Sequence, residues 1–224
     1  LLEKEFQAIR PDNRTCGQTV PWNAPASMEL WVQDLIALLD HLKHDRIHVV
    51  GHSLGGIIGW ALAHHFPERV ASLLMIGSSA IPAPRNGELF RALLDIRRSD
   101  AAAETWLRVL YPWLLRKEAF KDRDAINTAI AAGTAYPHAQ TADAMELQLA
   151  TLAKTDPTPF RAAPKVPCRA ILSHDDLLVP FDDAIGSLKG FDVVETSGLG
   201  HSLHWDDPDF IASEVRRMID ENRA

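Results

Sequence analysis

The sequence predicts an α/β fold with a mostly parallel sheet, helices on both faces of the sheet, and a helical insertion. Short apolar runs typical of buried strands alternate with helical segments at both ends of the chain. Between Ser79 and Pro167 this alternation is replaced by successive helical patterns. With 224 residues, 46% of them hydrophobic and 24% charged, the chain suits one packed domain with an insertion, and a disordered or fibrous protein is excluded.

The first part of the chain predicts a strand, a helix, a second strand and a second helix. Phe6 to Asp12 is a short β-like run that ends in loop residues. From Met28 to Lys43 apolar residues recur every three or four positions after Ser27, a suitable N-cap residue, which predicts an amphipathic helix. Arg46 to Val50 is a β-branched run that ends at a glycine, and Leu54 to Phe66 returns to helical composition.

Further buried strands are predicted at Val70 to Ile76, at Cys168 to Leu172 and at Val193-Val194, and Ile211 to Ile219 closes the chain as a helix. The helical segments of the insertion are Gly87 to Arg97, Ala101 to Leu115, Ala125 to Ala132 and Thr141 to Lys154. The prolines that flank it as stiff connectors are Pro82, Pro84, Pro157, Pro159, Pro164 and Pro167. We therefore expect a core of residues 1–79 and 166–224 and an insertion of residues 80–165.

Composition and charge exclude several classes of partner. The formal net charge is −7 and basic residues cluster no further than pairs, so nucleic acid is not expected to bind. A membrane span needs roughly 20 apolar residues, and charges or prolines interrupt every apolar stretch of this chain before it reaches that length. Cys16 and Cys168 are read as reduced thiols, and the first residues carry no signal-peptide pattern, so a cytoplasmic protein is expected. No feature of the sequence indicates an oligomeric state.

Gly51-His52-Ser53-Leu54-Gly55-Gly56 carries the strongest chemical signal. The segment lies between a predicted strand and a predicted helix, which is the context of the G-x-S-x-G nucleophile elbow. Such a turn strains the serine backbone and lifts the Ser53 hydroxyl into a cleft, and the N–H of Leu54 can then donate to an oxyanion. The alternative is a glycine-rich turn without a nucleophile, which many α/β proteins contain.

A serine nucleophile requires a base and an orienting carboxylate, which follow it in the chain order Ser, Asp, His in this architecture. Asp176 follows the predicted strand Cys168 to Leu172, and His201 follows the Val193-Val194 strand. The carboxyl ends of parallel strands meet at one crevice, so these three residues are expected to converge. Asp175 is the alternative acid if the loop is shifted by one residue.

With these motifs the chain resembles the α/β-hydrolase superfamily of serine hydrolases with a helical cap. Pro11 to Thr19 is similar to the D-x-R-G-x-G-x-S loop of the family, and Gly51 to Gly56 is similar to its elbow. Asp176 to Pro180 resembles the D-x-x-V-P segment that holds the acid. Gly200-His201 with Asp207-Pro208 resembles the G-H-x(n)-[ED]-P ending. The most similar members are small-molecule esterases, enol-lactonases and aminoacrylate-hydrolase-like proteins.

Two departures from the family concern backbone shape: Thr15 and Ser173 stand where the family commonly has glycine. A third concerns the front of the chain. The family's first strands and its His-Gly oxyanion loop precede the Asp12 loop, whereas this chain begins at Leu1 with no initiator Met. We therefore expect the functional protein to carry earlier residues that include an apolar strand and the second oxyanion donor.

The other histidines are weaker candidates. His204 lies on the same loop as His201, His52 is expected to pack beside the nucleophile, and His64 and His65 end a helix. No H-E-x-x-H or C-x-x-C spacing and no phosphate-binding glycine loop occurs, so neither a metal nor a cofactor is expected.

The resemblance implies a serine hydrolase that cleaves a small ester, lactone or similar acyl compound through an acyl-enzyme. Ser53 attacks, His201 transfers the proton, Asp176 orients the imidazole and Leu54 N–H binds the oxyanion. Residues 80–165 form the cap, and its candidate substrate-binding side chains are Trp106, Trp113 and Leu114. A serine nucleophile argues against haloalkane dehalogenases and epoxide hydrolases. The alternatives are C–C bond hydrolysis, perhydrolysis or cofactor-free oxygenation on the same triad, or a non-catalytic binding protein of this fold.

Overall fold

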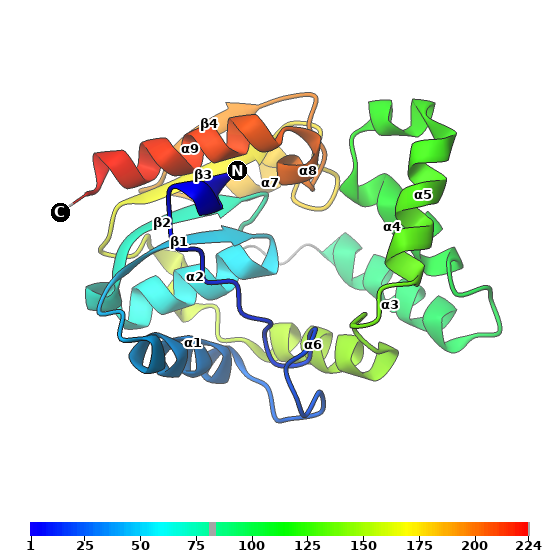
Figure 1. The fold of residues 1–224 in the computed structure, drawn as a ribbon, viewed down its shortest axis with the longest axis horizontal. Coiled ribbons are helices and arrows are strands. Elements are labelled where there is room, and N and C mark those ends of the chain that lie inside the picture. The colour runs from blue at the N-terminus through cyan, green and yellow to red at the C-terminus, as the bar shows by residue number, and fades with distance from the viewer. Residues whose placement is uncertain (81–83, 224) are drawn as a thin grey trace.

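The computed structural model describes residues 1–80 and 84–223. Within them one sheet has the strand order β1-β2-β3-β4, and every neighbouring pair is parallel. The strands are β1 (Ile47–His52), β2 (Val70–Ile76), β3 (Cys168–Ser173) and β4 (Asp192–Thr196). The predicted parallel sheet is confirmed (Figure 1).

Helices cover both faces of the sheet. On one face α1 (Met28–Leu42) and α2 (Leu54–His65) pack against alternate strand residues such as Leu73 and Met75. On the other face α8 (Leu203–Asp206) and α9 (Pro208–Glu221) pack against the intervening residues Leu74 and Ile76. The short α7 (Phe181–Ile185) belongs to the α1 and α2 side. This two-residue alternation is why β2 is a nearly continuous apolar run: both of its faces are buried.

The caps of α1 explain why the helix has the predicted length. Ser27 Oγ accepts a hydrogen bond from Leu30 N at 3.2 Å, which satisfies one of the free N–H groups of the first turn. At the other end Lys43 has φ 60°, and its N–H donates to the carbonyl oxygen of Asp40. This left-handed residue turns the chain out of the helix and toward β1.

The predicted strand at Phe6 to Asp12 is wrong. The chain begins with a short 3₁₀ helix (Leu2–Lys4) and then runs without regular structure until α1. A strand exists only through hydrogen bonds to a neighbour, and within residues 1–80 and 84–223 no backbone hydrogen bond joins this segment to the sheet. The segment after it is held instead by side chains: Arg14 donates to Asp34 of α1 at 2.8 Å.

Among the described residues between β2 and β3 there are four α-helices: α3 (Pro84–Arg98), α4 (Thr105–Leu114), α5 (Arg123–Thr134) and α6 (Ala142–Lys154). No strand occurs in the described part of this insertion. Figure 1 shows α3, α4 and α5 set apart from the sheet, with α6 returning toward α1. Leu107, Tyr111 and Ile130 form a separate small core between α4 and α5. The predicted connector Pro82 lies outside the described residues.

The second insertion helix begins later than predicted. The sequence predicts a helix from Ala101, whereas α4 starts at Thr105. Ser99 Oγ donates to the carbonyl oxygen of Ile96 and accepts from Ala101 N, so local side-chain bonds end α3 and hold the following residues in a turn. The described helices do not include one with the length and apolar character of a membrane-crossing segment.

Candidate active site

The turn that joins β1 to α2 holds Ser53 in a strained backbone conformation. Its φ is 50° and its ψ is −119°, a region that residues other than glycine rarely adopt. Ser53 N donates to the carbonyl oxygen of Ile76 at 3.0 Å, and Ser78 Oγ donates to the carbonyl oxygen of Ser53 at 2.7 Å. A Cβ atom on Gly51 would lie 2.3 Å from the carbonyl oxygen of Gly55, so this position requires glycine. The predicted strand, turn and helix are all present around Ser53.

Leu54 is the first residue of α2, so its backbone N–H has no partner inside the helix. Among the described residues no other acceptor takes this N–H. The helix dipole adds partial positive charge at the same end. The Leu54 N–H can therefore donate to negative charge that develops next to the Ser53 hydroxyl.

Asp176 and His201 form a buried hydrogen-bonded pair. The distance from His201 Nδ1 to Asp176 Oδ2 is 2.9 Å, and each residue is only 2% exposed. Asp176 Oδ1 accepts from the backbone N–H groups of Leu178 and Val179, both at 2.8 Å. These bonds fix the carboxylate and leave its second oxygen for the imidazole. Because the carboxylate accepts, Nδ1 of His201 carries a proton, and in neutral His201 the lone pair is on Nε2.

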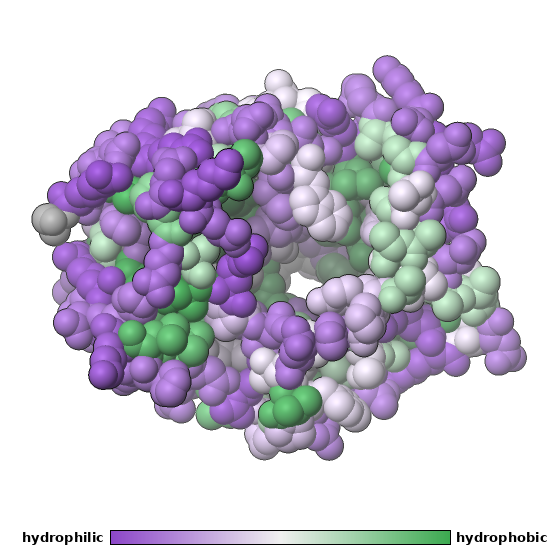
Figure 2. Space-filling model, in the orientation of Figure 1, coloured by the Kyte–Doolittle hydropathy of each residue, from purple (hydrophilic) through white to green (hydrophobic). Residues whose placement is uncertain are grey.

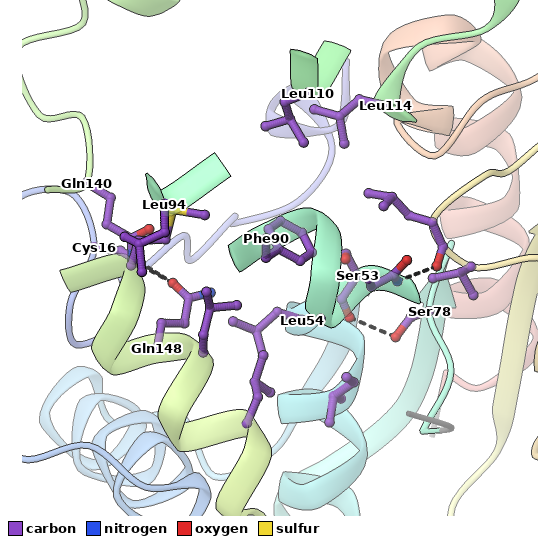
Figure 3. A pocket seen from close by; sticks show the side chains of 18 of the residues that line it. Cys16, Ser53, Leu54, Ser78, Phe90, Leu94, Leu110, Leu114, Gln140 and Gln148 are labelled. Carbon is purple, nitrogen blue, oxygen red and sulfur yellow. Dashed lines mark hydrogen bonds between the residues drawn. The ribbon is translucent and has the colours of Figure 1, made fainter. Parts of the chain in front are cut away.

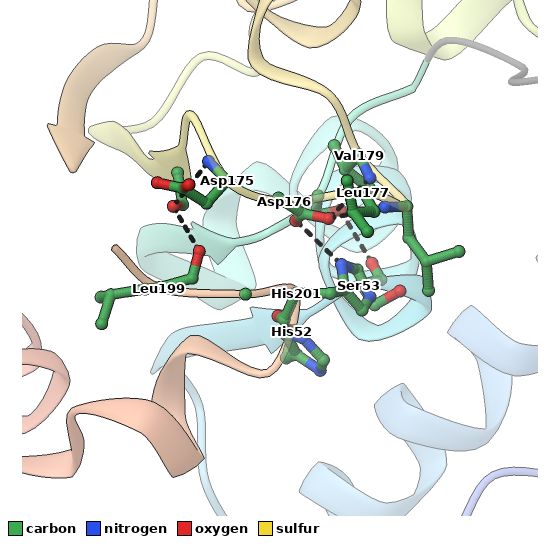
Figure 4. A network of polar contacts seen from close by, with 12 residues as sticks. His52, Ser53, Asp175, Asp176, Leu177, Val179, Leu199 and His201 are labelled. Atoms are coloured by element: carbon green, nitrogen blue, oxygen red, sulfur yellow. Dashed lines mark hydrogen bonds and ion pairs between the residues drawn. The ribbon is translucent and has the colours of Figure 1, made fainter. Parts of the chain in front are cut away.

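The neighbouring carboxylate, Asp175, faces a different way. Its Oδ2 accepts a hydrogen bond from Gly198 N at 2.6 Å, which ties the loop after β3 to the loop after β4. Figure 4 shows Asp176, His201 and Ser53 gathered together, with Asp175 turned away from them. The structure thus brings Asp176 to His201 and does not bring Asp175 there. In this structure Ser53 Oγ makes no hydrogen bond to His201.

His52 and His204 pack against each other beside His201. His52 Nε2 lies 2.8 Å from the carbonyl oxygen of His201, and the His52 ring is 4.6 Å from the His204 ring. Burial lowers the pKa of His52 to about 3, and the nearby His201 adds to this shift. Burial also lowers the pKa of His204. Both imidazoles are therefore neutral at physiological pH. His64 and His65 are exposed at the end of α2.

The two positions where glycine was expected are accommodated differently. Thr15 has φ 73°, so it adopts the left-handed conformation that favours glycine although it is buried and β-branched. Ser173 keeps an ordinary strand conformation at the end of β3. Its hydroxyl donates to the carbonyl oxygen of Leu199 at 2.5 Å, which holds the loop that carries His201.

A cavity of about 1950 Å³ separates the core from the insertion. Ser53, Leu54 and Ser78 line it on the core side, and α3, α4 and α6 supply mainly apolar side chains on the other. Figure 2 shows the hollow in the surface, and Figure 3 shows Phe90, Leu94, Leu110 and Leu114 around it. The depth and apolar lining suit a small organic ligand.

Two of the three predicted substrate-binding residues line this cavity. Trp106 and Leu114 contribute to its wall, and Trp113 does not. The Trp113 ring lies 5.2 Å from the guanidinium of Arg85 instead. Both tryptophans have the same helical periodicity in the sequence, and only the packing of α4 decides which one reaches the cavity.

Sequence reasoning missed the polar groups at the end of the cavity away from Ser53. Cys16, Arg97, Gln140 and Gln148 all line it there. No motif signals them, because they come from the N-terminal loop, from α3, from the loop before α6 and from α6 itself. Burial raises the pKa of the Cys16 thiol, so the thiol stays protonated.

The chain matches the model of the Alpha/beta hydrolase family over residues 1–214. A protein of Pantoea ananatis (strain LMG 20103) named "Putative carbamate hydrolase RutD" is 29% identical over 223 residues, which covers 93% of this chain and 77% of the relative. A protein of the same name from Variovorax paradoxus (strain S110) is 28% identical over 208 residues, which covers 91% and 76%.

Solved structures show the same fold at low sequence identity. The enol-lactonase from Burkholderia xenovorans LB400 has a TM-score of 0.82 and 20% identity, with 98% of this chain and 83% of that chain covered. A thermophilic esterase from Thermogutta terrifontis has a TM-score of 0.80 and 22% identity, with 100% and 83% covered. At these identities the likeness concerns the fold alone.

Proposed function

The chain belongs to the alpha/beta hydrolase family and is a hydrolase of that fold, and on this premise we propose that it cleaves a small ester, lactone or similar acyl compound with Ser53, His201 and Asp176. The observation that carries the proposal is the 2.9 Å bond between buried Asp176 and His201, next to a strained serine turn that opens on the cavity. The relatives named as carbamate hydrolases support a small acyl substrate.

In the first half of the reaction Ser53 Oγ attacks the acyl carbon while His201 Nε2 takes the hydroxyl proton. The C=O double bond opens to an oxyanion, to which Leu54 N–H donates. When the oxyanion collapses, the bond to the leaving group breaks and His201 returns its proton to that group. The acyl chain remains as an ester on Ser53.

In the second half a water molecule attacks the acyl-enzyme. His201 takes one proton from this water, the bond from the acyl carbon to Ser53 Oγ breaks, and the proton passes to Ser53. The carboxylic acid leaves and the free serine is restored. Throughout, Asp176 stabilises the positive charge that the imidazole gains, and its bond to Nδ1 leaves Nε2 free to exchange the proton.

We also propose that residues 80–165 act as the cap of this enzyme. Helices α3, α4 and α6 supply most of the cavity wall opposite Ser53. The end of α4 contacts the loop of the proposed base, because Ser202 N donates to the carbonyl oxygen of Leu114 at 2.8 Å. A cap in this place excludes water and selects the acyl substrate by shape.

Labelling with a fluorophosphonate and measurement of the intact mass test the proposed nucleophile. Wild-type protein should gain one adduct on the peptide that contains Ser53, and Ser53→Ala should gain none. Ser79→Ala is the matched control, because Ser79 also lines the cavity but does not occupy the turn. This control should label as wild type does. Persistent labelling of Ser53→Ala would overturn the assignment.

Turnover separates this proposal from a non-catalytic binding protein of the same fold. Hydrolysis of p-nitrophenyl acetate should show a burst of p-nitrophenol followed by steady release, because the acyl-enzyme accumulates. A protein that labels at Ser53 but releases no p-nitrophenol would instead be a binding protein of this fold.

A further inference from the structure

The cavity has two chemically different ends. At one end lie Ser53 and Ser78, and at the other lies a set of polar side chains, Cys16, Arg97, Gln140 and Gln148, here termed the distal polar cluster. Figure 3 shows Cys16, Gln140 and Gln148 across the cavity from Ser53, with Phe90 and Leu54 between the two ends. A ligand that fills the cavity therefore meets an apolar middle and a second polar end.

One of the two glutamines, Gln148, leaves hydrogen-bond donors without an acceptor. Gln140 Nε2 donates to Gln148 Oε1 at 2.6 Å and to the carbonyl oxygen of Thr15 at 3.1 Å. This bond occupies the Gln148 oxygen, and within the described residues the Gln148 amide nitrogen donates to nothing. The free amide hydrogens of Gln148 thus belong to a side chain that lines the cavity.

Arg97 is a second group of unsatisfied donors, and it carries a full charge. Its guanidinium lies 4.6 Å from the Trp106 ring, donates to the carbonyl oxygen of Gln140, and approaches the weak acceptor Met145 Sδ at 3.4 Å. No carboxylate oxygen of the described residues lies within 4.0 Å of it. Burial lowers the pKa of Arg97, and no neighbouring carboxylate opposes this effect.

The next residue along α3, the exposed Arg98, is by contrast fully paired with carboxylates. Arg98 contacts Asp143 at 2.7 Å and Glu146 at 2.8 Å, and these carboxylates raise its pKa. Glu146, although it lines the cavity, is therefore already neutralised by Arg98. Asp12, a further carboxylate of the lining, accepts from Gln18 N at 2.8 Å. A partly buried cation without a counterion is costly, and a bound anion would offset that cost.

We propose that the distal polar cluster binds a carboxylate of the substrate, so that the preferred acyl compound carries an anionic group separated from the scissile carbonyl by an apolar segment. This inference rests on the proposed function of Ser53. Arg97 and the Gln148 amide donate to the two carboxylate oxygens, in the planar geometry that guanidinium groups recognise. Phe90 and Leu94 contact the apolar segment. The protonated Cys16 thiol adds no repelling charge.

Matched pairs of anionic and neutral esters test this proposal. With the carboxylate on the acyl side, the mono-p-nitrophenyl esters of glutarate and adipate are compared with p-nitrophenyl pentanoate and hexanoate. With the carboxylate on the alcohol side, acetoxybutanoate and acetoxyhexanoate are compared with butyl and hexyl acetate. In one of the two series, kcat/KM should be at least about 10-fold higher for the anionic ester, because a charge-assisted hydrogen bond is gained.

Arg97→Met should remove this preference. We expect kcat/KM to fall by about 10- to 100-fold on the anionic ester and to stay within about 2-fold on the neutral ester. Gln148→Leu should also lower kcat/KM on the anionic ester, by a smaller factor. This variant tests the proposal even if Arg97→Met does not fold. Arg108→Met is the matched control and should leave the preference unchanged, since Arg108 is paired with Glu104 at 2.9 Å and neither residue lines the cavity.

The neutral esters distinguish the two levels of the proposal. If wild type hydrolyses neither kind of ester, the proposed function of Ser53 fails. If it hydrolyses neutral esters but prefers no anionic ester in either series, the carboxylate site is overturned while the function stands. An equal loss on both kinds of ester in folded Arg97→Met would also overturn it, because the arginine would then support the cavity without recognising charge.

Discussion

His52 Nε2 lies 2.8 Å from the backbone carbonyl oxygen of His201, so the residue before the proposed nucleophile is bonded to the proposed base. A carbonyl oxygen can only accept, and therefore Nε2 of His52 carries the proton and donates it. The two rings are 4.8 Å apart. This bond joins the turn after β1 to the loop after β4, which are brought together only by the fold of the sheet.

Replacing His52 should loosen the loop of the proposed base without removing a reacting group. In His52→Phe an aromatic ring is kept and the hydrogen bond is lost, so we expect kcat on an activated ester to fall about 5-fold, since a hydrogen bond of this kind contributes about 1 kcal/mol. His65→Phe is the control, because His65 is exposed at the end of α2. An unchanged kcat in His52→Phe would show that the loop is positioned by other contacts.

The pH dependence of the free energy of unfolding should also reveal the lowered pKa of His52. Its pKa is about 3 in the folded protein and 6.5 as an ordinary value, so the unfolded chain binds more protons between these limits. The free energy of unfolding should fall as the pH drops from about 6.5 toward about 3. Between about pH 7.5 and pH 5, urea unfolding should show that wild type loses about 1–2 kcal/mol more than His52→Phe. The lowered pKa of His204 gives a loss in the same direction that both proteins share.

The two neighbouring carboxylates should have separate effects on turnover. Asp176→Asn removes the charge that supports the imidazole and should lower kcat by about 10³- to 10⁴-fold with little change in secondary structure. Asp175→Asn weakens only the bond to Gly198 N and should lower the free energy of unfolding by about 1 kcal/mol. Both are measured by steady-state kinetics and urea unfolding. A greater kinetic loss in Asp175→Asn would reverse the assignment.

The backbone strain at Ser53 should be measurable as a difference in the free energy of unfolding between two variants. Ser53→Gly and Ser53→Ala both lack the hydroxyl, but only alanine keeps a Cβ atom at φ 50°. Relief of about 1–3 kcal/mol of strain outweighs the extra entropy of an unfolded glycine, about 0.4–1 kcal/mol. The free energy of unfolding should therefore be about 1 kcal/mol higher for the glycine variant than for the alanine variant. Equal stabilities would mean that the turn stores no strain.

The cavity wall should respond differently at two neighbouring positions of α4. Leu114 lines the cavity, so Leu114→Ala should shift the preference among p-nitrophenyl esters toward longer acyl chains by roughly 10-fold in the ratio of kcat/KM values. Trp113 lies over Arg85 outside the lining, so Trp113→Leu should leave the profile flat and lower only stability. A shifted profile in Trp113→Leu would mean that the cavity extends beyond its present wall.

Features that depend on chain neighbours could be predicted from the sequence. The β2 run is apolar over its whole length because both faces are buried, and its observed bounds Val70–Ile76 equal the predicted ones. Ser27 caps α1 where its position before an amphipathic pattern predicts a cap. The Gly51 to Gly56 motif predicts its own tight turn, since steric limits on Ser53 and Gly51 act within a few residues.

Features that depend on distant partners were decided by the tertiary structure alone. Phe6 to Asp12 has the composition of a strand but pairs with no strand of the described residues, and pairing is not encoded in the segment itself. Resemblance to a family segment predicted Asp176 as the partner of His201 and left Asp175 open as the alternative, and the packing of the loops after β3 and β4 brings Asp176 to His201 and Asp175 to Gly198. The distal polar cluster is assembled from four separate segments, so the missing counterion of Arg97 becomes visible only when these segments meet in space. Local sterics and burial periodicity can be read along a chain, whereas hydrogen-bond partners and cavity walls arise from contacts between its remote parts.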